Sequence, residues 1–124
     1  MNSKVTIKIQ PDSCCSLFWW EDGTCCGDSD SLTLYEGGDS IEIKIPGLKD
    51  WLNEYMWYCL VPYEAGEITL EELNKTFDWK SFHNRGLSLA AQVKKLLPLN
   101  TELIYCSPFE DKSGIIDSDG ILIK

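Results

Sequence analysis

The chain of 124 residues is poor in positive charge. Eleven Lys and Arg and one His stand against twenty Asp and Glu, for a formal net charge of −9. Recognition of phosphates needs a basic surface, so this balance argues against direct binding to nucleic acid. The sequence also lacks a run of about 18 apolar residues, the kind that crosses a membrane. We therefore expect no membrane span, and we expect any protein partner to be cationic.

Catalytic motifs are equally scarce. The sequence has one imidazole, His83, and contains neither a glycine-rich phosphate loop nor a metalloprotease His pair. His83 lies at the edge of an apolar helical stripe, where we expect it to bond a neighbour rather than to act as a base. Residues 117–120 begin like a calcium loop, but the later ligands of such a loop do not follow. The sequence therefore predicts no enzyme and no cofactor.

The N-terminal residues and the cysteines bear on the compartment. Residues 1–10 alternate polar and apolar side chains, which is not typical of a signal peptide. The cytoplasm is the expected location, and it keeps thiols reduced. Four cysteines form two adjacent pairs: Cys14, Cys15, Cys25 and Cys26. We favour partly buried thiols that act as small apolar side chains, while a four-thiolate zinc site and an opportunistic disulfide stay open.

Periodicity predicts the secondary structure. Apolar and polar residues alternate over several stretches, which predicts strands at 5–10, 17–20, 32–35, 40–45 and 102–106. Gly37-Gly38 and Asp119-Gly120 predict hairpin turns, the second of them between residues 115–116 and 121–123. Helical spacing predicts helices at 48–58, from Thr69 onward and at 79–97, with a connector over 60–66. Thr69 and Asp78 are the expected N-caps.

This order of elements predicts an α+β fold. We expect a mostly antiparallel sheet with two to three helices packed on one face. No linker in the sequence is long enough to divide the chain, so residues 1–124 are expected to form a single compact domain.

Negative charge is concentrated in residues 10–43, which hold eight acids and no Lys or Arg. Residues 75–97 hold five Lys or Arg and one Asp, a net charge of +4. Aromatic anchors among carboxylates are typical of a protein-binding surface, because the carboxylates steer a basic partner. The alternative is a solvated acidic loop whose tryptophans turn into the core. The candidate contact residues are Phe18, Trp19, Trp20, Glu21, Asp22, Asp28, Asp30, Glu36 and Asp39.

The C-terminal half contains several short motifs within residues 77–98 and 103–111: Asp78-Trp79, Phe82-His83, Arg85-Gly86-Leu87 and Pro108-Phe109-Glu110-Asp111. This segment resembles small bacterial immunity proteins that are encoded beside contact-dependent inhibition and other polymorphic toxins. The resemblance implies a cytoplasmic, non-enzymatic protein that binds and neutralises a cognate basic toxin domain, often a nuclease. Within the segment, caps and ion pairs that hold the fold are expected of Asp78, His83, Arg85, Glu110 and Asp111. The N-terminal half, with its cysteine pairs and acidic loop, departs from the family pattern.

Direct neutralisation of a basic toxin by residues 18–39 is our leading hypothesis, and two others stay open. A small metal-binding or redox module would use the two cysteine pairs, and stoichiometric zinc in the purified protein would favour it. An acidic inhibitor that mimics nucleic acid would instead target a DNA-binding enzyme.

Overall fold

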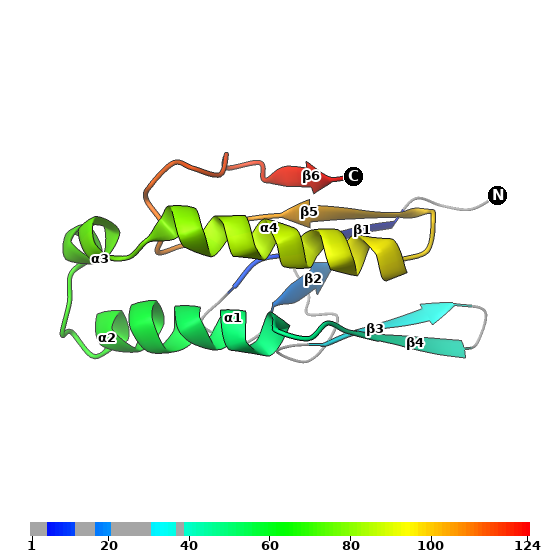
Figure 1. Cartoon of the computed structure of the whole chain (residues 1–124), viewed down its shortest axis with the longest axis horizontal. Helices are drawn as coiled ribbons and strands as arrows, with labels where there is room; N and C mark the ends of the chain where they lie inside the picture. Colours follow the sequence, from blue (N-terminus) through cyan, green and yellow to red (C-terminus); the bar gives the residue numbers. More distant parts are fainter. Residues whose placement is uncertain (1–4, 12–16, 21–30, 37–38) are drawn as a thin grey trace.

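The main sheet has four strands. The computed structural model describes residues 5–11, 17–20, 31–36 and 39–124 (Figure 1). The strand order is β2-β1-β5-β6, with the bounds Phe18–Trp20, Val5–Ile9, Thr101–Tyr105 and Ile121–Ile123. The outer pairs β1–β2 and β5–β6 are antiparallel, and the central pair β1–β5 is parallel. The predicted α+β class is confirmed, and the sheet is mixed.

The parallel pair follows from the order of elements. Two parallel neighbours need a crossover connection of a dozen residues or more. All the helices lie between β1 and β5 in the sequence and supply that connection. A second, two-stranded antiparallel sheet is formed by β3 (Ser31–Glu36) and β4 (Asp39–Lys44), which confirms the predicted hairpin.

The first helix is longer than predicted. It comprises α1 (Leu48–Tyr55), a π turn at Met56–Leu60 and α2 (Val61–Glu64), so the predicted connector is wrong over 60–64. Pro62 lies in this segment, and a proline removes an N–H donor from an α-helix. The backbone already follows i→i−5 bonding just before it, since the N–H of Val61 donates to the carbonyl of Met56.

The next two helices begin at the predicted caps. The hydroxyl of Thr69 accepts a bond of 3.1 Å from the N–H of Glu72 at the start of α3 (Leu70–Thr76). Asp78 accepts a bond of 3.0 Å from the N–H of Ser81 at the start of α4 (Trp79–Leu96). Both side chains satisfy N–H groups that have no partner within the helix, as expected of N-caps.

The predicted C-terminal hairpin is wrong. Ile121–Ile123 form β6, which pairs with β5, whereas residues 115–116 are not a strand. Gly120 adopts a φ of +81°, and its N–H donates to the carbonyl of Asp117 in the turn before β6. The edge of β5 offers β6 an ordered partner inside an existing sheet, which a short isolated hairpin lacks.

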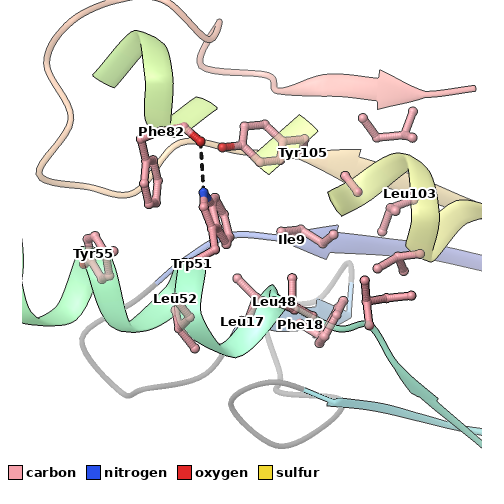
Figure 2. Close-up of a cluster of buried hydrophobic side chains, with 14 of the residues drawn as sticks. Ile9, Leu17, Phe18, Leu48, Trp51, Leu52, Tyr55, Phe82, Leu103 and Tyr105 are labelled. Atoms are coloured by element: carbon pink, nitrogen blue, oxygen red, sulfur yellow. Dashed lines mark hydrogen bonds between the residues drawn. The ribbon is translucent and has the colours of Figure 1, made fainter. Parts of the chain in front are cut away.

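The core lies between the sheet and the helices. Figure 1 shows α4 crossing in front of β1 and β5, with α1 beside it. Trp51 of α1 stacks on Phe82 of α4 with ring centroids 4.5 Å apart, and its Nε1 donates a 2.9 Å bond to the carbonyl of Phe82 (Figure 2). The side chains of Ile7, Leu103 and Tyr105 reach this core from the sheet and are fully buried. Stacking and burial together fix α1 against α4.

Candidate functional site

The candidate contact residues are only partly described. Glu21, Asp22, Asp28 and Asp30 lie outside the described residues, as do all four paired cysteines, Cys14, Cys15, Cys25 and Cys26. Trp19 and Trp20 belong to β2, where they are the partners of Lys8 and Ile7 in β1. Glu36 and Asp39 are partners in the backbone register of β3 and β4. Two of the predicted acids are thus held at one end of a sheet.

Phe18 is a correction. Its side chain is completely buried in the core cluster, so the prediction that it contacts a partner is wrong. Ile9 is its partner in β1, and both side chains are buried. A phenylalanine side chain gains free energy when it is removed from water into the core, and this favours the buried position.

His83 is the centre of a buried polar network that joins α4 to the segment after β5. Its Nδ1 lies 2.8 Å from the hydroxyl of Tyr105, and its Nε2 lies 2.6 Å from Oδ2 of Asp111. The side chains of His83 and Asp111 are each 1% exposed. The prediction that His83 bonds a neighbour is confirmed. A carboxylate, an imidazole and a hydroxyl in this order are also the parts of a nucleophilic triad.

The hydroxyl in this network is closed to a substrate. Tyr105 is fully buried, and burial raises the pKa of its hydroxyl, with Asp111 raising it further. Burial also acts to raise the pKa of Asp111, but the hydrogen bonds from His83 and Ser113 outweigh it, so that pKa is lowered. The network therefore holds a carboxylate in place and presents no nucleophile to solvent.

A second buried pair lies beside this network. The hydroxyl of Tyr55 donates a 2.5 Å bond to Oε1 of Glu110. Asn74 ties the same segment to α3, because its side chain donates to the carbonyl of Glu110 and accepts from the N–H of Lys112. Burial raises the pKa of the nearby Cys59 thiol, and Glu110 raises it further. Cys59 is therefore held as a thiol, which is the unreactive form.

A cleft of about 360 Å³ opens between α1 and α4. Arg85 of α4 binds both carboxylate oxygens of Glu54 across it, and this bond raises the pKa of the guanidinium. The cleft is lined by Gly47, Asp50, Trp51, Glu54, Arg85, Ser88 and Leu89. Its guanidinium is already matched to a carboxylate, so the cleft has no unpaired cation to offer an anionic ligand.

The polar residues within the segments 77–98 and 103–111 therefore hold the fold. Asp78 caps α4, Arg85 pairs with Glu54, and His83 pairs with Asp111. Glu110 receives the bond from Tyr55. These contacts confirm the expected structural roles.

Sequence reasoning missed one surface. Trp57 and Tyr58, in the π turn, are 65% and 70% exposed, although they belong to a helix that was expected to be amphipathic. Residues 50–74 hold six acids and no Lys or Arg, and so form a second acidic stretch. This stretch is the signal in the sequence that marks the helix as a candidate surface.

Among the described residues, no group of three or more His, Cys, Asp or Glu is placed to hold a metal ion. None of the helices among them is both long and apolar enough to cross a membrane.

No protein-family model, curated protein or solved structure matches this chain.

Proposed function

We propose that this chain is an immunity protein that neutralises a basic toxin domain of the nuclease class. It acts by direct protein–protein contact in the cytoplasm and without catalysis. The observation that carries the proposal is the charge of residues 10–43, which hold eight acids and no Lys or Arg. Carboxylates grouped in this way attract a cationic surface over long range and raise the rate of association. The resemblance of residues 77–98 and 103–111 to immunity proteins supports the same function.

The described geometry is compatible with a role at the surface. The imidazole of His83 is buried and bonded at both nitrogens, and the thiol of Cys59 is buried with a raised pKa. The hairpin β3–β4 forms a sheet of its own, and Figure 1 shows it at the lower right, separate from the four-stranded sheet. Backbone belonging to the acidic stretch is thereby held at the periphery of the molecule.

The test uses the basic toxin domain encoded by the neighbouring gene. Changing Glu21→Gln, Asp22→Asn, Asp28→Asn and Asp30→Asn together is expected to slow association at least about 10-fold, since long-range steering is lost. Stopped-flow kinetics at low salt measures this rate. Co-expression then shows whether the wild-type chain protects cells from the toxin.

A matched pair of variants separates a local effect from net charge. Asp28 and Asp30 flank a serine, and so do Asp117 and Asp119 near the C-terminus. D28N/D30N and D117N/D119N change the charge equally, and only the first is expected to slow association markedly. Equal effects of the two pairs on the association rate contradict the assignment of the contact surface to the acidic loop. A neighbouring gene that encodes no basic domain, or no protection by the wild-type chain, contradicts the function.

A further inference from the structure

The helix from Leu48 to Glu64 exposes a group of large apolar side chains. Trp57 is 65% exposed, Tyr58 is 70% exposed and Val61 is 41% exposed. Other exposed apolar residues lie on separate elements, such as Leu99 before β5 and Leu122 in β6. Two adjacent exposed aromatic residues leave a large apolar area in contact with water, which is costly unless a partner covers it.

The π turn sets which side chains face outward. With about 100° per residue, Leu60 would lie about 140° away from Tyr55 in an α-helix. The i→i−5 bond from Val61 to Met56 widens the turn and returns Leu60 to the buried side, where Tyr55 and Cys59 also lie. Trp57 and Tyr58 are then left together on the solvent side. The backbone thus adopts a rare geometry that presents two aromatic residues side by side in sequence.

The charge around this face selects the kind of partner. Residues 50–74 hold six acids and no Lys or Arg, and among them Asp50, Glu64 and Glu67 are exposed. Exposed carboxylates and exposed aromatic rings in one segment suit Lys and Arg side chains, which bind a carboxylate or stack on a ring. A second copy of this chain would bring the same acids against one another, and that repulsion disfavours a homodimer through this face.

We propose that Trp57, Tyr58 and Val61 form a docking surface for a basic protein surface, with the two aromatic rings as its anchors. This inference rests on the proposed function, because the basic surface is that of the toxin domain. Figure 1 shows the β3–β4 hairpin and the helix that begins at Leu48 following one another along the lower edge of the view. Trp and Tyr are enriched among the residues that contribute most to binding energy at protein interfaces.

The experiment measures the affinity of three chains for the toxin domain encoded by the neighbouring gene. W57A/Y58A is expected to weaken binding at least about 30-fold, the loss typical of an anchor residue. The matched control is L99A/L122A, which removes two exposed side chains from other elements and is expected to bind as the wild type does. Urea unfolding establishes that both variants keep the stability of the wild type.

Each outcome has a distinct meaning. If the wild-type chain binds the toxin domain and W57A/Y58A binds it equally well, the docking surface is wrong and the proposed function still stands. A wild-type chain that does not bind the toxin domain overturns the proposed function and, with it, this inference. Sedimentation of the wild-type chain alone tests whether a second copy of the chain occupies this face. A dimer that W57A/Y58A abolishes assigns the face to a second copy and overturns the basic partner.

Discussion

Gly86 of α4 shows how closely single residues are fitted in this core. A Cβ at this position would lie 2.5 Å from the hydroxyl of Tyr105 and would also collide with the indole of Trp51. The hydrogen at Gly86 thus lets α4 approach both α1 and β5, at the cost of about 1 kcal/mol in helix propensity relative to Ala. Tyr105 is thereby held where it bonds His83.

Asp111→Asn tests the buried pair at the residue scale. Its lowered pKa means that the carboxylate stabilises the fold fully above the unfolded value of about 3.9 and loses this effect as the pH falls through the folded pKa. At neutral pH we expect a loss of about 3 kcal/mol, because a buried pair is broken. Urea unfolding at a series of pH values measures the difference between wild type and variant.

That difference is expected to shrink as the solution becomes more acidic than about pH 4. The control is Asp117→Asn, an exposed carboxylate, which should change the free energy of unfolding by less than about 0.5 kcal/mol. A difference for Asp111→Asn that stays constant down to about pH 2 contradicts the stabilising role of its charge.

At the scale of elements, the sequence predicts helix caps better than it predicts which strands pair. The caps at Thr69 and Asp78 were predicted from a few neighbouring residues, and the hydrogen bonds confirm them. The pairing of β6 with β5 was missed because it joins residues distant in sequence. The π turn was missed because helical periodicity predicts i→i−4 bonding, which the bond from Val61 to Met56 replaces. A strand does not specify its partner by its own alternation, since many edges accept the same pattern.

Asp78 offers a prediction for α4 as an element. Asp78→Ala removes the acceptor for the N–H of Ser81 and is expected to lower the free energy of unfolding by about 1 kcal/mol. Asp78→Asn keeps an acceptor oxygen in the same place, so its loss should be smaller. Urea unfolding of the two variants gives both numbers. Equal losses would indicate that the charge of Asp78, rather than the cap, matters.

At the scale of the whole molecule, the uneven charge matters more than its sum. Acidic stretches precede α4, whereas the segment 75–97 carries a net charge of +4. A net charge of −9 therefore understates how strongly negative the segments 10–43 and 50–74 are. A field of this kind acts on the approach of a cationic partner before any contact forms.

The dependence of toxin association on salt tests this field. Raising the ionic strength from about 0.01 M to about 1 M shortens the Debye length from about 30 Å to about 3 Å. We expect the association rate to fall at least about 10-fold over this range, and the dissociation rate to change less, because steering acts on encounter. Stopped-flow kinetics measures both rates. An association rate that is insensitive to salt contradicts electrostatic steering.

The sequence by itself determined the α+β class, most element positions and the caps, because periodicity and capping depend on residues a few positions apart. It also determined that any charged surface over 10–43 is acidic. Only the tertiary structure decided that Phe18 is buried, that His83 is bonded to Tyr105 and Asp111, and that Trp57 is exposed. Those outcomes depend on which distant surfaces meet, and a single chain's local pattern does not encode that choice.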